Sequence, residues 1–283
     1  MTDAEEFEAH RGRLRAVAYR MLGSLAEADD AVQETWLRLQ RADPSGIENL
    51  GAWLTTVVAR VCLNVLRSRA HRKEEPFGVR VPDPIVSTES GGGPEQQAVL
   101  ADSVGLALLV VLETLAPAER LAFVLHDLFG VPFEEIAPML DRTPAAARQL
   151  ASRARRRVRG QAPAPDPDRG RQRAVVDAFF AAARDGDFEG LLAVLDPEVV
   201  LHADAGRGHP LTLSLRGARE VAGRAVTFGH LYPYARPALV NGAAGVVVAT
   251  AERVLSVMAF TVHDGRIVAI QVLLDPERLK SIW

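Results

Sequence analysis

Hydrophobic residues recur at helical spacing through about the first seventy positions of the chain. In residues 7–22 apolar side chains return every three or four positions, and Gly23 follows as a stop. The same spacing covers residues 27–40, and a third stretch over residues 51–73 is apolar at its start and basic at its end. These patterns predict a helical domain over residues 1–73.

Residues 74–95 break this pattern with proline, glycine, serine and acidic residues, which predicts an acidic linker. Helical spacing resumes over residues 96–160, where three short helices with tight turns fit. Thr143 and Pro144 have the side chains of a helix cap and a first helical position, and Pro138 is expected to interrupt the middle helix. This order of elements predicts a helix-turn-helix.

A proline-rich spacer over residues 161–170 precedes a region with a different pattern of predicted elements. Two helical stretches are followed by a strand at 197–204, another helix and then consecutive strands. Asn241-Gly242 and Asp264-Gly265 have the composition of hairpin turns. Helices followed by a strand meander predict an α+β domain with a curved antiparallel sheet over residues 171–283.

The charge distribution adds a candidate function to the helix-turn-helix. The chain has a net charge of −3, yet seven arginines stand against one acid between Asp141 and Gly160. Such a patch suggests a polyanion partner, although the solvated face of an ordinary amphipathic helix has the same composition. Small residues open the helix and arginines continue toward its end, which is typical of a helix that enters a DNA groove. Candidates for base edges are Arg148, Gln149 and Ser152, and candidates for phosphates are Arg153, Arg155, Arg156 and Arg159.

A second basic run lies in residues 59–73, so two basic helices flank an acidic linker. The segments EADDAVQETWLRL, LGAWLTTVVARVCLNVLRSRAHR and LAPAERLAFVLHDLFGVPFEEIAPMLDRTPAAARQLASRARRRV resemble an extracytoplasmic-function sigma factor of the sigma-70 family. The resemblance covers about residues 5–160 in two blocks. It implies two all-α domains: sigma-2, which binds the RNA polymerase clamp and the minus-ten element, and sigma-4, which binds the minus-thirty-five element and the polymerase flap. Core RNA polymerase and promoter DNA are the implied partners.

The resemblance also implies residue roles. The residues implied to bind polymerase are Asp29, Asp30, Gln33, Glu34 and Trp36. They combine charged side chains with an aromatic anchor. The helical spacing of Trp36 fits a place in the core equally well. Asn49, in the loop from Pro44 to Leu50, would hold an unstacked minus-ten base. The adjacent DNA would be met by Asn64, Arg67 and Arg69.

The C-terminal domain resembles the SnoaL-like domain, a cone-shaped α+β barrel that one sigma subgroup carries in place of a separate anti-sigma factor. That subgroup has a proline-bearing linker motif, a DGGGK-like motif and an NPDKL-like motif. The corresponding stretches here, each with departures, are VPDP (81–84), DAGRG (204–208) and DPERL (275–279). The regulatory contacts implied are Pro82, Asp83, Pro84, Asp204, Gly206, Gly208, Asp275, Pro276 and Leu279.

Two other function classes remain open at this point. A helix-turn-helix regulator with a ligand-sensing C-terminal domain would bind duplex DNA without polymerase. An enzyme would use His202, Asp204 and His230, as some SnoaL-like proteins use a pocket aspartate and histidine. The favoured interpretation is a sigma factor regulated by its own C-terminal domain, with a small-molecule pocket of unidentified ligand inside the cone.

The remaining expectations are absences. The sequence has no metal-ligand spacing, nucleotide-binding loop or nucleophile elbow, so no metal, cofactor or catalysis is expected. No run approaches the roughly 20 apolar residues of a membrane span, and the N-terminal residues lack an apolar signal segment. The single cysteine, Cys62, fits a reducing compartment, so a cytoplasmic protein is expected.

Overall fold

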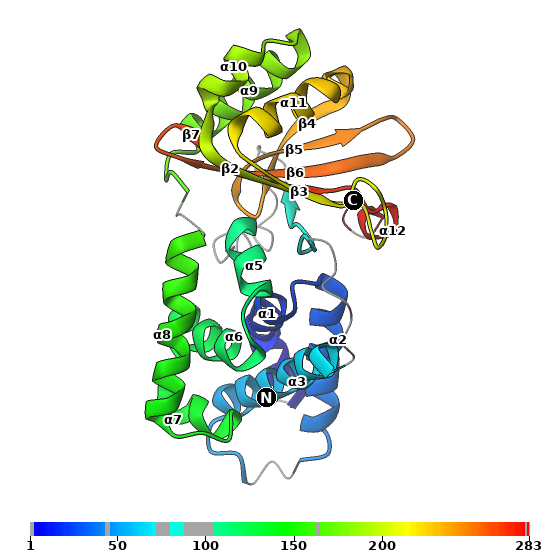
Figure 1. The fold of residues 1–283 in the computed structure, drawn as a ribbon. Helices are drawn as coiled ribbons and strands as arrows, with labels where there is room; N and C mark the ends of the chain where they lie inside the picture. The colour runs from blue at the N-terminus through cyan, green and yellow to red at the C-terminus, as the bar shows by residue number, and fades with distance from the viewer. Residues whose placement is uncertain are drawn as a thin grey trace. The chain divides into compact units, whose positions relative to one another are not determined.

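The computed structural model describes residues 3–42, 46–71, 80–87, 105–161, 165–280 and 282. The chain divides into two units, each assembled from two pieces of sequence (Figure 1). Unit 1 comprises Met1–Pro76 with Val111–Gln161, and unit 2 comprises Phe77–Val110 with Ala162–Trp283.

Three helices make up the first part of unit 1. They are α1 (Asp3–Leu22), α2 (Leu25–Leu39) and α3 (Leu50–His71), and each packs against the other two. Gly23 ends α1 with a positive φ of 68°. By length and composition alone α3 could cross a membrane, with a mean hydropathy of 1.3 over Leu50–Ala70. Its apolar side packs against α1 and α2 in the helical core, which accounts for that composition.

The rest of unit 1 holds the predicted helix-turn-helix. After α5 (Leu106–Glu113) its elements are α6 (Pro117–Phe123), the π-helical turn η2 (Val124–Leu128), α7 (Phe133–Ile136), the 3₁₀ turn η3 (Ala137–Met139) and α8 (Pro144–Gln161). Pro138 lies in η3, directly after α7 stops, as its sequence predicted. Thr143 caps α8, because its Oγ1 accepts the Ala146 N–H at 3.2 Å. The buried alanines of α8 permit close packing against α6.

Unit 2 is built on a sheet in the order β1-β4-β5-β6-β7-β2-β3. Its strands are β1 (Val86–Ser87), β2 (Leu195–Asp204), β3 (Leu213–Arg216), β4 (Ala235–Val240), β5 (Ala243–Ala249), β6 (Val254–His263) and β7 (Arg266–Leu273). The predicted turns at Asn241-Gly242 and Asp264-Gly265 are confirmed, and all four residues have positive φ. The predicted antiparallel pairing holds for five strand pairs and is wrong for one, because β2 lies beside β7 and pairs with it in parallel.

Three helices cover one face of this sheet: α9 (Arg169–Asp185), α10 (Phe188–Val194) and α11 (Ala218–Thr227) (Figure 1). The 3₁₀ helix η4 (Gly229–Tyr234) follows α11, and the short α12 (Pro276–Leu279) packs beside β6. Phe179 of α9 and Phe260 of β6 meet in the core with ring centroids 5.6 Å apart. The result is a cone-shaped α+β domain, as expected.

Candidate nucleic-acid interface and linker clamp

The exposed side of α8 carries most of the side chains predicted to meet DNA. Arg148, Gln149, Ser152, Arg156 and Arg159 are all exposed. The guanidinium carbon of Arg148 lies 5.2 Å from the ring centroid of Phe133 in α7, so this arginine is held by stacking rather than by an ion pair. The helix therefore presents arginine and amide donors along one solvent-facing side.

Other arginines of α8 form ion pairs inside unit 1. Arg155 contacts the Asp127 carboxylate at 2.5 Å, and Arg153 contacts Glu119 at 2.8 Å. Arg157 approaches the second oxygen of Glu119 at 3.4 Å. These pairs brace α8 against α6 and η2, so Arg153 and Arg155 reach a phosphate only by sharing or leaving their carboxylates. The acids Glu119 and Asp127 were the sequence signal for this bracing, and the charge count over α8 alone did not include them.

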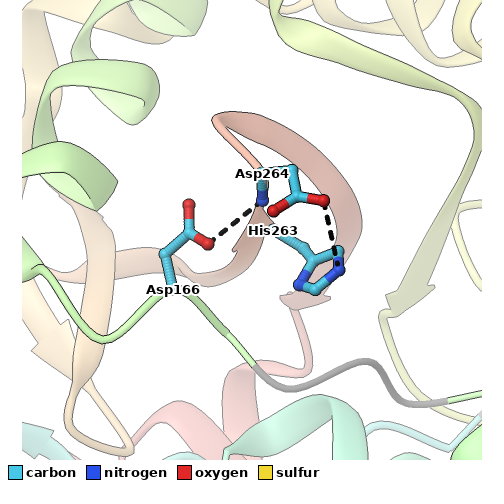
Figure 2. A group of neighbouring side chains, drawn as sticks. All are labelled: Asp166, His263 and Asp264. Carbon is cyan, nitrogen blue, oxygen red and sulfur yellow. Dashed lines mark hydrogen bonds and ion pairs between the residues drawn. The ribbon is translucent and has the colours of Figure 1, made fainter.

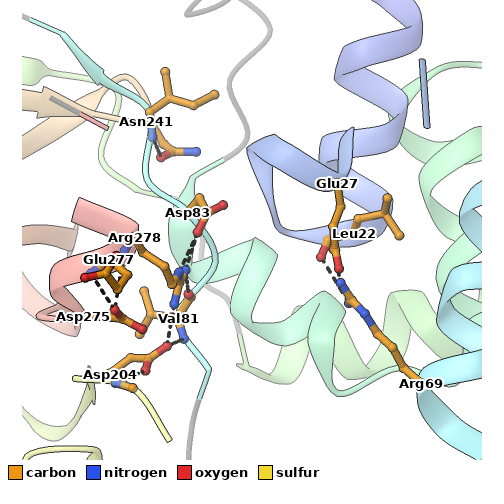
Figure 3. A network of polar contacts seen from close by, with 12 residues as sticks. Leu22, Glu27, Arg69, Val81, Asp83, Asp204, Asn241, Asp275, Glu277 and Arg278 are labelled. Atoms are coloured by element: carbon orange, nitrogen blue, oxygen red, sulfur yellow. Dashed lines mark hydrogen bonds and ion pairs between the residues drawn. The ribbon is translucent and has the colours of Figure 1, made fainter. Parts of the chain in front are cut away.

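The basic end of α3 is divided in a similar way. Asn64 and Arg67 are exposed, whereas Arg69 is half-buried. Arg69 binds the Glu27 carboxylate of α2 and donates to the Leu22 carbonyl at 3.4 Å (Figure 3). Arg69 thus ties α3 to the turn between α1 and α2, a structural contact that sequence reasoning missed.

Asn49 lies directly before α3. Its Oδ1 accepts the Ala52 N–H at 3.0 Å, so it caps the helix, and its side chain is exposed. Residues 44 and 45 of the predicted base-binding loop lie outside the described residues. The carbonyl oxygen of the Asn49 amide serves the cap, which leaves the amide N–H₂ group to meet a base.

The predicted polymerase-binding residues share the outer side of α2. Asp29, Asp30 and Gln33 are exposed, and Glu34 and Trp36 are half-buried. Two of them are engaged, because Asp29 binds Arg15 at 2.6 Å and Glu34 binds Arg38 at 2.8 Å. The Trp36 ring packs against Phe7 with centroids 4.9 Å apart, so this side chain is partly core and partly surface.

In unit 2 the VPDP segment of the predicted linker is bound to the C-terminal domain. Arg278 of α12 is the centre of this site (Figure 3). Its Nε and Nη2 contact one Asp83 carboxylate oxygen at 2.8 and 2.5 Å, and its Nη1 contacts the Asp204 carboxylate at 2.8 Å. Its Nη2 also donates to the Val81 carbonyl at 2.5 Å. One guanidinium therefore joins two acidic side chains that are both buried.

Main-chain contacts extend the same attachment. The Val81 N–H donates to Asp204 at 3.0 Å, and the Ile85 N–H donates to Asn241 Oδ1 at 2.9 Å. The Asn241 N–H donates back to the Ile85 carbonyl at 2.8 Å. Directly after Ile85, β1 adds to the edge of β4. We call Asp204, Asn241 and Arg278 the linker clamp.

The structure brings most of the predicted regulatory residues to this clamp. Pro82, Asp83 and Pro84 are buried in it. Asp275 caps α12 by accepting the Glu277 and Arg278 N–H groups at 3.0 and 3.4 Å, Pro276 is the first residue of that helix, and Leu279 is buried beneath it. Gly206 donates to Asp204 at 3.1 Å with a φ of 94°.

Gly208 is exposed in the loop after β2, outside these hydrogen bonds. Sequence reasoning missed Arg278 and Asn241. The signal for Arg278 was chemical, since two acids in apolar surroundings require a cation.

The three side chains of the enzyme alternative lie apart. His202 bonds Ser214 at 3.1 Å, and burial lowers the pKa of its imidazole. Asp204 belongs to the linker clamp, and His230 is exposed and contacts the Thr227 carbonyl at 3.2 Å. None of the three lines the cavity of this domain. The arrangement gives no shared catalytic site for these residues.

Asp166, His263 and Asp264 are close enough to suggest a cation site, with ligand atoms within 4.8 Å of one another (Figure 2). The Asp166 oxygens, however, accept the N–H groups of Asp264 and Gly265 at 3.0 and 3.1 Å. The Asp166 N–H also donates to the Val262 carbonyl at 2.7 Å. The cluster therefore fastens the spacer before α9 to the β6–β7 hairpin.

Comparison with known proteins finds a sigma-70 family match for each of the two helical regions of unit 1. Sigma-70 region 2 matches residues 7–72, and Sigma-70 region 4 matches residues 105–158. The chain is 39% identical to the ECF RNA polymerase sigma factor SigJ of Mycobacterium tuberculosis, over 98% of this chain and 93% of that protein. It is 37% identical to the probable ECF sigma factor SigI of the same species, over 98% and 94%. The crystal structure of SigJ superposes with a TM-score of 0.78 over 98% of each chain at 36% identity. The chain therefore belongs to the ECF (extracytoplasmic-function) RNA polymerase sigma factors, which bind RNA polymerase and regulate transcription initiation.

Proposed function

We propose that the C-terminal domain regulates this sigma factor by holding the linker between sigma regions 2 and 4 in a docked state. The observation that carries the proposal is the linker clamp, in which Arg278 binds Asp83, Asp204 and the Val81 carbonyl. A linker that is docked has fewer arrangements than a free one. Docking therefore selects among the spacings of the two regions that could engage a promoter.

The energetics favour a firm attachment. Removing one partner of a buried ion pair typically costs about 3–5 kcal/mol, because the other charge stays buried and uncompensated. Loss of Arg278 would strand two buried carboxylates, and release of the linker is the simplest way to hydrate Asp83. A difference of about 1.4 kcal/mol already changes a population ratio tenfold. The clamp contacts are thus strong enough to set which linker state dominates.

The same proposal assigns a promoter-binding role to each of the two basic helices, α8 and α3. The exposed residues of α8 would read and position the upstream promoter element, while Asn64 and Arg67 of α3 would lie against DNA near the minus-ten element. The outer side of α2 would bind the polymerase clamp, with Trp36 as an anchor that is already held by Phe7. Asn49 would contact a flipped minus-ten base through its amide N–H₂ group.

The test is run-off transcription with core RNA polymerase, comparing the parent protein with Arg278→Gln. The variant should change promoter-dependent transcript yield several-fold, and hydrogen exchange of residues 80–87 should accelerate. Arg216→Gln is the matched control, because Arg216 is in the same domain, is 72% exposed and lies 3.9 Å from the equally exposed Glu198 carboxylate. Unchanged transcription with faster exchange in the linker would contradict the regulatory role. Unchanged exchange would contradict the attachment itself.

A further inference from the structure

A cavity of about 120 Å³ lies in unit 2, between the helices and the sheet. Its walls come from α9, β2, α11, η4, β5, β6 and β7. Most lining side chains are aliphatic, and four are aromatic: Phe179, Phe180, Phe228 and Tyr232. An apolar cavity of about 150 Å³ holds one benzene molecule, whereas typical drug-sized pockets are about 300–1,000 Å³. This volume matches a compound with a single ring or a short branched chain.

Two polar residues interrupt these apolar walls. Ser256 of β6 is 4% exposed, lines the cavity, and its hydroxyl has no hydrogen-bond partner among the residues that the structure describes. Because this hydroxyl faces the cavity and not the packed core, a ligand in the cavity can supply its acceptor or donor. The Ser256 hydroxyl makes no contribution to the hydrogen bonding of the described core residues.

Arg224 of α11 is the one charged residue in the lining. Its guanidinium carbon lies 4.8 Å from the ring centroid of Phe228, and no ion pair to a described carboxylate holds it. A guanidinium at an apolar wall binds a carboxylate with two parallel N–H···O bonds, and low surrounding polarity strengthens them. The cavity thus combines an apolar body with a cation and a hydroxyl.

We propose that this cavity binds a small monocarboxylic acid whose apolar body is about the size of one aromatic ring. The carboxylate contacts Arg224, the ring contacts the phenylalanines, and the Ser256 hydroxyl completes the polar contacts. None of His202, Asp204 and His230 lines the cavity, so the proposal concerns binding and includes no chemical step.

The experiment measures binding of benzoate to the full chain by calorimetry and saturation-transfer NMR, with benzamide as the neutral probe of the same shape. Benzoate should bind at least tenfold more tightly than benzamide, and Arg224→Gln should remove that preference. Arg219→Gln is the matched control: Arg219 lies on the same helix and also stacks on an aromatic ring, Phe188 at 5.4 Å, but outside the cavity lining. It should bind both probes as the parent does.

Filling the cavity supplies the second arm. Ala225→Phe should abolish binding of both probes while circular dichroism and the melting transition confirm folding, and Ser256→Leu replaces it if that variant does not fold. The proposal is overturned if benzoate fails to bind at millimolar concentration, if Arg224→Gln retains the preference, or if the filled variant still binds.

Discussion

At the scale of single residues, Arg278 combines tasks that are usually divided. Its planar guanidinium contacts two carboxylates and one carbonyl. Its main-chain N–H donates to the carboxylate of the cap residue Asp275. A fork of five donors can meet acceptors in several directions at once, whereas an ammonium group acts as a point charge. The identity of this cation therefore matters as well as its charge.

We expect Arg278→Lys to keep the charge and lose the geometry. The variant should hold the linker less firmly than the parent but more firmly than Arg278→Gln, because the carboxylates keep a cation without its directed N–H groups. Hydrogen exchange of residues 80–87 in the three proteins measures this order. Equal exchange in the lysine and glutamine variants would show that charge contributes nothing.

Cys62 gives a second prediction at this scale. Burial raises the pKa of its thiol to about 12, and the thiolate is the reactive form. At pH 8 the folded protein should resist alkylation by iodoacetamide, while protein unfolded in guanidinium should react readily at the same pH. Intact-mass spectrometry after timed quenching distinguishes the two. Rapid labelling of the folded chain would contradict the burial.

At the scale of elements, the arginines of α8 divide into ion-paired and exposed groups. Arg153 and Arg155 pair with acids of the same unit, while Arg156 and Arg159 are exposed without ion pairs to described residues. Charge counting predicted the patch correctly as a feature of one helix. It could not divide the roles, because Glu119 and Asp127 belong to preceding elements that only the fold brings beside α8.

For α8 we expect different consequences from neighbouring substitutions. Arg148→Ala should lose discrimination at one or two upstream bases, worth about 1–3 kcal/mol for a bidentate contact. Arg156→Ala should weaken binding at every promoter and reduce the salt slope by about one contact. Holoenzyme binding across a promoter panel at several salt concentrations checks both, with exposed Arg171 of α9 changed to alanine as the control. Identical promoter profiles for the two variants would refute this division.

The ends of strands β2 and β7 lie between the cavity and the linker clamp. Ala203 of β2 and Leu274, directly after β7, line the cavity, and the residues that follow them, Asp204 and Asp275, contact Arg278. Sequence patterning found β2 because apolar residues alternate along it, but not its parallel neighbour, since a period of two carries no information on pairing partners. The clamp residue Arg278 was hidden for the same reason: its acids lie far away in sequence.

At the scale of the whole molecule, the linker is the part that composition described least well. Proline, glycine and acids over residues 74–95 predicted a spacer, and the structure places residues 80–87 in the C-terminal unit as a bound segment with a strand. A polar segment of this kind becomes ordered only through contacts with residues elsewhere in the chain. Its own sequence therefore does not predict that it binds the C-terminal domain. The four residues of the VPDP resemblance, 81–84, lie within this bound segment.

Removing Asp275–Trp283 should change polymerase-dependent transcription several-fold, because the deletion takes Arg278 with it. Removing only the residues after Leu279 leaves the clamp side chains in place and is the control. Deleting everything after Gly160 should have a third effect, since it also removes the sheet that receives the linker. Run-off assays at matched concentrations compare the proteins, and equal activity of all of them would eliminate the regulatory role.

We further expect weak promoter binding by the free protein and specific binding in the presence of core polymerase. Our reason is the acidic composition of the linker: we expect its carboxylates outside the clamp to compete with DNA for the basic helices until polymerase engages them. Fluorescence anisotropy with promoter and scrambled duplexes, with and without core polymerase, checks this. Tight and sequence-specific binding by the isolated chain would instead favour a conventional repressor.

The hydrogen bonds between Arg278 and Asp83 join residues 195 positions apart in the chain. The sigma region 4 match ends at residue 158, so a ribosome adding about 5–20 residues per second reaches Arg278 roughly 6–24 s after both sigma regions have been synthesised. During this interval the nascent chain contains both sigma regions, but the linker clamp is incomplete because Arg278 has not yet been synthesised. If the clamp regulates the sigma factor as we propose, a polymerase that captures the chain in that interval meets it without the clamp, and the rate of translation then contributes to its control.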